Sequence, residues 1–221
     1  MLPIALGRGQ VPVSESASER TSQTTEPSAE PTGGAESPVV AVYGDAYSAG
    51  SAQGGAGAAG WPALVADRLD ADVRLHAVPG AGYVAGLGGG TFLAQVQAAP
   101  EPDADVVVVF GSRNDTGAPS QEIADRAAEV YGALQTASPS AAVVVIGPAW
   151  SDEAVPAETL LVRDAVRTAA ADAGLTFVDP LEEGWFFGRL ELIGSDAIHP
   201  TDEGHAYLAD LIEPVLREAL Q

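Results

Sequence analysis

Short apolar runs alternate along the chain with longer segments in which apolar residues recur every three to four positions. Short apolar, β-branched runs are typical of buried strands, and the longer spacing is typical of one face of a helix. The predicted strands are Val39–Tyr43, Val73–Val78, Asp105–Phe110, Ala142–Ile146 and Leu175–Val178. The predicted helices are Trp61–Leu69, Thr91–Ala98, Ser120–Ala137, Pro156–Ala173 and Thr201–Leu220. This alternation predicts an α/β fold, a three-layer α/β/α sandwich around a doubly wound, mainly parallel five-stranded sheet.

The segment before the first strand has a different composition. Residues 14–37 are rich in Ser, Thr, Glu, Pro and Gly and cannot bury enough apolar surface to fold. We therefore predict a disordered linker over residues 1–37 and one folded domain over residues 38–221. The apolar start, Met1–Arg8, is too short for an export signal but suits the remnant of one. The pattern favours a secreted or cell-envelope protein, with a disordered cytoplasmic tail as the alternative.

Charge and composition exclude several classes of partner. The chain has 10 Lys+Arg against 31 Asp+Glu and a net charge of −21, which disfavours nucleic acid and anionic membranes as partners. It has no cysteine, which excludes disulfides, thiolate metal sites and a cysteine nucleophile. No apolar run reaches the roughly 18 residues that a membrane-spanning helix needs.

A G-x-G-x-x-G pattern occurs at residues 55–60. In dinucleotide-binding proteins these glycines directly follow the first strand, and an acidic residue ends the second strand. Here the glycines come well after the first strand, and the second ends in Pro79-Gly80. A flavodoxin-like nucleotide binder would need a phosphate-binding loop directly after the first strand, and we find no such loop in the sequence. The sequence therefore predicts no nucleotide cofactor.

Four polar or glycine-rich segments follow predicted strand ends or precede the last helix. They are Gly44-Asp45-Ala46, Pro79–Gly82, Gly111–Asp115 and Asp196–Pro200. Because ligands of doubly wound sheets bind outside the carboxyl ends of the strands, we expect the four segments to meet at one edge of the sheet.

Asp196 and His199 have the spacing of a catalytic pair. A carboxylate on one imidazole nitrogen fixes the tautomer and stabilises the imidazolium, which leaves the other nitrogen to face a nucleophile. The alternative is that both residues only cap and border the last helix. Asn114 offers an amide donor to an oxyanion, and Gly80 an unshielded backbone N–H. Each also suits an ordinary turn.

These segments resemble the conserved blocks of the SGNH (GDSL-type) hydrolases, in order and over most of residues 38–221. The glycine block matches Gly80, the asparagine block Gly111–Asp115, and the histidine block Asp196-x-x-His199-Pro200. The resemblance implies a serine esterase or lipase without metal or other cofactor. It also implies His199 as general base, Asp196 as its partner, and an oxyanion hole formed by the backbone N–H groups of residue 46 and Gly80 with the Asn114 side chain.

The first block departs from the family at the nucleophile. Gly44, Asp45, Tyr47 and Ser48 match the pattern Gly-Asp-Ser-Tyr/Leu-Ser, but Ala46 stands where the serine belongs. Ser48 lies two residues further along and is a poor substitute. We expect a nearly inactive chain, either an engineered serine-to-alanine variant of an active esterase or a natural pseudoenzyme that binds an acylated glycan or lipid.

Five residues are candidates for substrate binding. Trp185 and Phe186 suit a pocket wall or the packing of a loop against the sheet. Trp150 has the same two interpretations. Arg113 suits a substrate carboxylate, phosphate or sugar, or else an ion pair with a surface acid. Asp45 directly precedes the nucleophile position. The expected ligand is a small ester or an acylated glycan or lipid.

Overall fold

The computed structural model describes residues 37–86 and 90–221, so the predicted linker lies outside the described residues except for its last position. Five strands form one sheet in the order β2-β1-β3-β4-β5, and all four neighbouring pairs are parallel. The strands are β1 (Val39–Gly44), β2 (Asp72–Leu75), β3 (Val106–Phe110), β4 (Ala142–Ile146) and β5 (Thr176–Val178). This confirms the predicted fold class.

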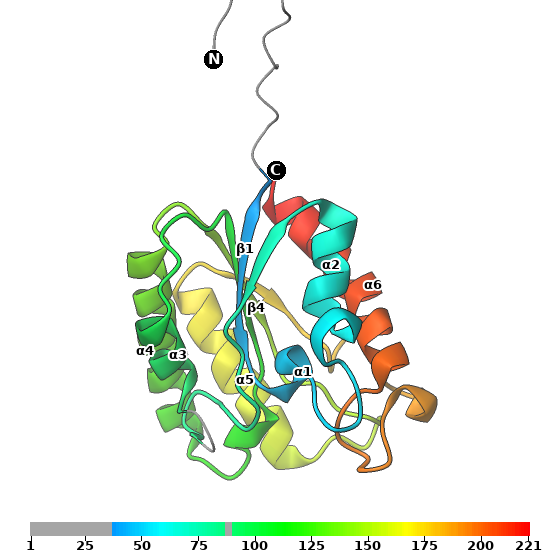
Figure 1. The fold of residues 1–221 in the computed structure, drawn as a ribbon. Helices are drawn as coiled ribbons and strands as arrows, with labels where there is room; N and C mark the ends of the chain where they lie inside the picture. Colours follow the sequence, from blue (N-terminus) through cyan, green and yellow to red (C-terminus); the bar gives the residue numbers. More distant parts are fainter. Residues whose placement is uncertain (1–36, 87–89) are drawn as a thin grey trace, which may run out of the picture. The chain divides into compact units, whose positions relative to one another are not determined.

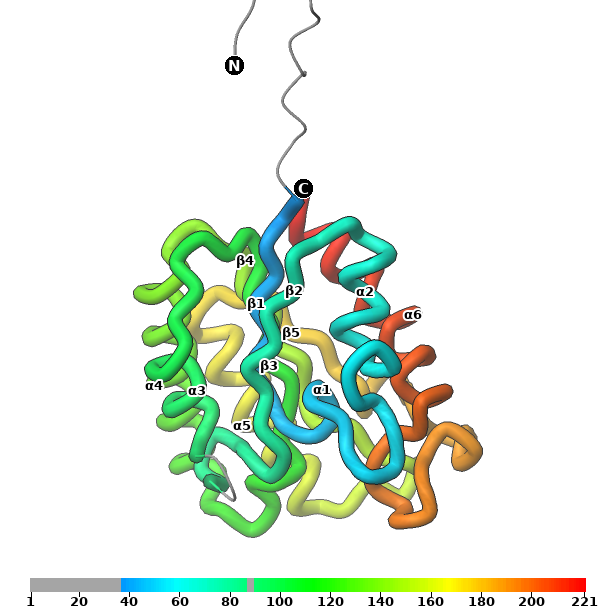
Figure 2. Tube along the Cα trace, in the orientation of Figure 1, coloured from blue at the N-terminus to red at the C-terminus, as the bar shows by residue number. Residues whose placement is uncertain are grey.

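Helices cover both faces of the sheet (Figure 1). The helices are α1 (Ala46–Ala49), α2 (Trp61–Leu69), α3 (Phe92–Ala98), α4 (Ser120–Ala137), α5 (Ala157–Asp172) and α6 (Asp202–Ala219). The trace in Figure 2 shows α2 and α6 on one side of the strands and α3, α4 and α5 on the other. Thr201 caps α6 as predicted, because its Oγ1 accepts from Gly204 N at 3.1 Å. Among the described residues, no helix is long and apolar enough to cross a bilayer.

The strands alternate their side chains between two hydrophobic layers. Val40 and Val42 point to the layer that contains α2 and α6, whereas Ala41 and Tyr43 point to the layer of α3, α4 and α5. All four are fully buried. Burying a valine stabilises the fold by roughly 1.5–3 kcal/mol. Because both faces of the sheet are covered, every position of a central strand can be apolar, and its sequence shows no alternation with polar residues.

The sheet order places the topological switch point between β1 and β3. From β1 the chain crosses to β2 on one side, and from β3 it crosses to β4 on the other. The connections therefore diverge beyond the carboxyl ends of β1 and β3, which is where ligands bind in such sheets. Asp45 directly follows β1, and Asn114 lies in a short 3₁₀ turn (Arg113–Asp115) after β3.

The segment between β1 and α2 was expected to be a loop from Gly44 to Gly60, because it is rich in small residues and glycine, and this expectation is wrong in part. The segment contains α1 and a 3₁₀ turn over Gly57–Ala59. A four-residue helix is too short to show apolar periodicity, and it forms here because Asp45 accepts from Tyr47 N at its first turn. The second strand is also shorter than predicted, although His76 N and Val78 N still donate to carbonyls of β1.

Gly55→Ala is expected to destabilise the protein more than Gly57→Ala. Both glycines have positive φ (+77° and +58°), so alanine costs about 1–2 kcal/mol of backbone strain at either position. A Cβ on Gly55 would also overlap the buried ring of His205, whereas a Cβ on Gly57 meets nothing within 4 Å. The overlap should add about 1–3 kcal/mol to the loss at Gly55 alone. Urea unfolding of the two variants measures the difference, and equal losses would show that His205 moves aside freely.

Candidate active site

Ala46 is the first residue of α1 and is 5% exposed. The capping Asp45 takes the next three N–H groups, Tyr47 on its side chain and Ser48 and Ala49 on its carbonyl. Among the described residues nothing accepts from the N–H of Ala46 itself. This N–H therefore remains free at the start of the helix, where it can bind a developing negative charge.

Ser48 is fully buried in the same helix, and its Oγ has no hydrogen-bond partner among the described residues. Residues two apart on a helix do not share a face. Ser48 therefore does not take the place of a residue at position 46, as the sequence indicated.

Asn114 connects the first and second segments of the site. Its Nδ2 donates to Asp45 Oδ2 at 3.0 Å and to the carbonyl of Ala81 at 2.7 Å. Ser112 Oγ donates to the same carbonyl at 3.3 Å. If Asn114 turns one N–H toward a ligand, the Ala81 carbonyl still has a donor.

Gly80 lies in the turn held by these contacts. Its φ is +82°, and Ala81 N donates back to Val78 O at 3.1 Å. No acceptor for the N–H of Gly80 lies within the described part of the chain. The buried carboxylate of Asp115 fixes the segment that follows, because it accepts from the backbone N–H groups of Tyr83, Val84 and Ala85 at 2.7–2.8 Å.

Asp196 and His199 form the pair that their spacing predicts. Oδ2 of Asp196 lies 2.7 Å from Nδ1 of His199, and Oδ1 accepts from the backbone N–H groups of Ile198 and His199 at 2.9 Å. The imidazole Nε2 has no hydrogen-bond partner among the described residues. The carboxylate therefore orients the ring and leaves one nitrogen available for proton transfer.

Two contacts that the sequence did not reveal hold this loop in place. Tyr47 Oη donates to the carbonyl of Ile198 at 2.7 Å, which ties the loop to α1. Gln53 Oε1 accepts from both N and Oγ of Ser195, at 2.9 and 3.1 Å. Neither contact has a signal in the sequence, because each joins residues more than 140 positions apart.

The electrostatics of the two aspartates differ. Burial raises the pKa of Asp45 to about 7, although its hydrogen bond from Tyr47 N opposes the rise. Partial burial acts to raise the pKa of Asp196 too, but hydrogen bonds from the His199 side chain and from two backbone N–H groups lower it to about 2. Asp196 therefore remains a carboxylate over the whole range in which a histidine exchanges its proton.

Arg113 forms no ion pair within the described residues, so the surface-acid interpretation of this residue is wrong. Its guanidinium lies over the ring of Trp150, 4.2 Å from the centroid. The chain folds in this way because Trp150 follows β4, the neighbour of β3. The stack places both residues beyond the carboxyl ends of adjacent strands.

Trp185 and Phe186 are 2% and 0% exposed, so neither forms an open pocket wall. Trp185 packs edge-on against Phe110, and Phe186 packs against Tyr47. The packing interpretation therefore holds, and both rings belong to the hydrophobic cluster that contains Phe110 and Tyr47.

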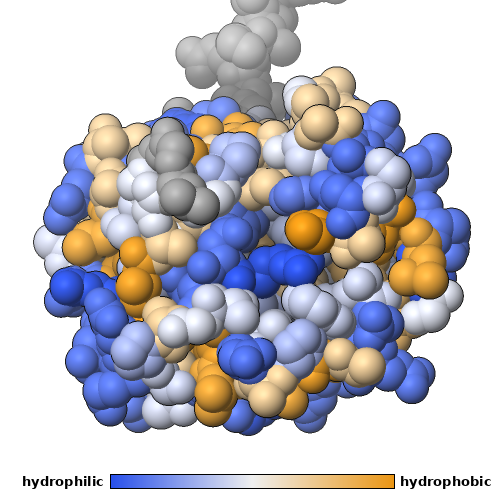
Figure 3. Space-filling model, turned by 90° about the horizontal axis from the view of Figure 1, so that it is seen from below, coloured by the Kyte–Doolittle hydropathy of each residue, from blue (hydrophilic) through white to orange (hydrophobic). Residues whose placement is uncertain are grey.

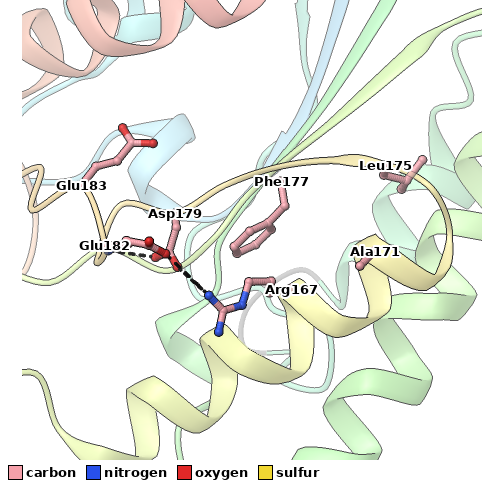
Figure 4. A pocket seen from close by; sticks show the side chains of 7 residues that line it. All are labelled: Arg167, Ala171, Leu175, Phe177, Asp179, Glu182 and Glu183. Carbon is pink, nitrogen blue, oxygen red and sulfur yellow. Dashed lines mark hydrogen bonds and ion pairs between the residues drawn. The ribbon is translucent and has the colours of Figure 1, made fainter.

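The face at the carboxyl ends of the strands has hydrophilic residues at its centre and hydrophobic residues around them (Figure 3). A separate cavity of about 420 Å³ lies beside edge strand β5 (Figure 4). Its Asp179 carboxylate is already bound by Arg163 Nη1 at 2.9 Å and by two backbone N–H groups. No residue of the four segments lines this cavity, so we place the site at the carboxyl ends of β1 and β3.

Comparison with known proteins identifies the family and supports the fold. The sequence model of the GDSL-like lipase/acylhydrolase family matches residues 42–207. GDSL lipase Rv0518 of Mycobacterium tuberculosis is 40% identical over 186 residues, which cover 80% of each chain. A crystal structure of TesA superposes with a TM-score of 0.69 at 21% identity, over 82% of this chain and 99% of the other. A family two carbohydrate esterase from Clostridium thermocellum, in complex with cellohexaose, superposes with a TM-score of 0.68 at 15% identity, over 83% and 64%.

Proposed function

The chain belongs to the GDSL-like lipase/acylhydrolase family, and from this premise we propose that it has the site of a serine ester hydrolase whose nucleophile position carries alanine. The observation that carries the proposal is the pair of Asp196 and His199, 2.7 Å apart and joined to α1 through Tyr47. A free imidazole nitrogen beside the start of α1 suits a proton acceptor for a hydroxyl at position 46.

With serine at position 46, the hydroxyl oxygen attacks the ester carbonyl carbon while Nε2 of His199 takes the hydroxyl proton. The carboxylate of Asp196 stabilises the imidazolium. His199 then donates the proton to the departing alcohol, and water hydrolyses the acyl-enzyme with His199 again as base. Each step uses only groups of the chain, the ester and water.

The tetrahedral oxyanion would be held by three donors. The N–H groups of residue 46 and Gly80 have no acceptor among the described residues and need no rearrangement. Asn114 contributes its Nδ2 by releasing the Ala81 carbonyl, which keeps its bond from Ser112. The two backbone donors are fixed before the reaction and stabilise the oxyanion without a reorganisation cost, whereas Asn114 must first break one hydrogen bond.

Ala46 removes the nucleophile and leaves these groups in place, so we propose that the chain binds esters with almost no turnover. The intact Asp196–His199 pair and the two free backbone N–H groups support an engineered replacement of a catalytic serine. The alternative, a natural binding module for acylated glycan or lipid, rests on Ala46 itself. The parent gene distinguishes them: a serine codon at position 46 supports replacement, and an alanine codon supports the binding module.

The substrate class that we propose is a carboxylic ester, either a simple ester or an acylated glycan or lipid. The family includes lipases and acylhydrolases, and a structural relative binds cellohexaose. The burial of Trp185 and Phe186 removes one argument for a long apolar acyl pocket.

A fluorophosphonate probe tests the proposal directly, because it reacts much faster with a serine that is activated by a base than with an ordinary hydroxyl group. We expect Ala46→Ser to gain one covalent adduct, mapped by mass spectrometry to the peptide that contains position 46. The unchanged chain should gain none. An adduct on Ser48 in both proteins, or none in a folded Ala46→Ser protein, would contradict the proposed site.

A further inference from the structure

Arg113 is a cation in the candidate active site that no group of the described chain neutralises. It precedes the oxyanion donor Asn114 and lies over the Trp150 ring at 4.2 Å. Its Nη1 is buried and has no hydrogen-bond partner. A buried N–H of a charged group that lacks an acceptor costs free energy, unless a ligand provides the acceptor.

The charge balance of the chain makes this arrangement unusual. All ten basic residues are arginines, against 31 acids. Six of the eight described arginines form ion pairs, namely Arg68, Arg74, Arg126, Arg163, Arg167 and Arg217. Arg189 lies over Tyr207 at an exposed position. Arg113 is therefore the described arginine that is both partly buried and without a carboxylate.

The two buried acids of the candidate site have other hydrogen-bond partners. Asp115 accepts three backbone N–H groups, and Asp45 accepts from Tyr47 N and Asn114 Nδ2. Burial raises the pKa values of Asp45 and Tyr47, and the charge of Arg113 opposes the rise in both. A side-chain hydrogen bond from Arg113 adds to this effect at Tyr47. The guanidinium thus acts on the centre of the site, while its buried Nη1 has no hydrogen-bond partner.

We propose that Arg113 binds an anionic oxygen group of the substrate, a carboxylate or phosphate close to the ester carbonyl, and so makes the site selective for anionic esters. The guanidinium lies over the ring of Trp150, and its Nη1 has no hydrogen-bond partner among the described residues. A guanidinium is the cation best suited to bind a carboxylate or phosphate through its planar N–H groups. This inference rests on the proposed hydrolase function and names its substrate class.

The test compares anionic and neutral esters of similar shape in the Ala46→Ser protein. The first comparison places the negative charge on the acyl group, with mono-4-nitrophenyl glutarate as the anionic ester and 4-nitrophenyl valerate as the neutral one. The second comparison places the negative charge on the alcohol part, with 4-acetoxybenzoate as the anionic ester and its methyl ester as the neutral one. Rates are corrected for uncatalysed hydrolysis. We expect the anionic ester to have a kcat/KM about tenfold or more above the neutral ester in one arm, the worth of a charged hydrogen bond.

The variants are compared by their selectivity ratio, which is kcat/KM for the anionic ester divided by kcat/KM for the neutral ester. This ratio does not depend on the fraction of the protein that is folded. Arg113→Gln should bring the ratio to about one, and Arg113→Lys should keep part of it, because lysine retains the charge without the paired donors. Arg189→Gln, which removes the other stacked arginine, should leave the ratio unchanged. A ratio near one before substitution, or one that Arg113→Gln does not alter, overturns the proposal.

Calorimetry with the unchanged Ala46 chain separates this proposal from the hydrolase function. Monomethyl glutarate or 4-acetoxybenzoate should bind, about tenfold or more tightly than methyl valerate or methyl 4-acetoxybenzoate, and Arg113→Gln should abolish the difference. If Ala46→Ser is inert while this Arg113-dependent binding remains, the hydrolase function fails and the anion site stands. Equal binding of charged and neutral ligands overturns the anion site whatever the activity.

Discussion

Ala46→Ser should raise the rate of 4-nitrophenyl acetate hydrolysis by about 10⁴-fold or more over the unchanged chain, since loss of the serine from a triad costs about 10⁶ in kcat. The reason is structural as well as chemical. The helix that holds position 46 is capped by Asp45, and its first N–H is free, so the new hydroxyl arrives in a site that otherwise needs no change. Initial rates at mildly alkaline pH measure the gain.

The matched control for this prediction is Ser48→Ala in the Ala46→Ser background, which should keep the gained activity. Ser48 is buried, and its Oγ makes no hydrogen bond to His199 or to any other described residue. The same series with butyrate and octanoate shows the preferred acyl length. If the Ala46→Ser protein is folded but hydrolyses the ester no faster than the unchanged chain, then α1 does not present its first residue to the ester. That result would contradict the enzyme interpretation.

His199→Ala in the Ala46→Ser background should remove most of this gain, about 10³-fold or more, because the serine then has no base. Asp196→Asn should lower kcat by a similar factor. It leaves an acceptor for the two backbone N–H groups but removes the charge that fixes the tautomer of the ring. Steady-state kinetics of the three proteins measure the losses.

The pair should also act as one unit. If Asp196 works through His199, the double variant loses hardly more than His199→Ala alone. Independent losses that multiply would show that Asp196 has another role.

The pKa of Asp196 is about 2, so the activity of the Ala46→Ser protein between pH 5 and pH 9 should show no titration of this carboxylate. Proton uptake by the Asp196 carboxyl group between pH 5 and pH 9, followed by carbon NMR of the side chain, would contradict this assignment.

The strands and long helices could be predicted because their signals are local. The apolar run Ala142–Ile146 and the helical spacing of Ser120–Ala137 predicted both elements with their observed bounds. The Asp196–His199 pair was also predictable, since its members are three residues apart and one turn brings them together. In contrast, α1 was missed because its formation depends on one capping carboxylate and on packing against β1, not on periodicity.

The fold class, the four segments of the candidate site and the absence of a serine at position 46 can all be read from the sequence, because each depends on residues that are close along the chain. The roles of several single side chains became clear only from the folded structure. It enclosed Trp185 and Phe186, placed Arg113 on Trp150 instead of beside an acid, and tied the His199 loop to Tyr47. The physical reason is that burial, stacking and hydrogen bonding between distant segments depend on which strands become neighbours, and no local pattern encodes these contacts.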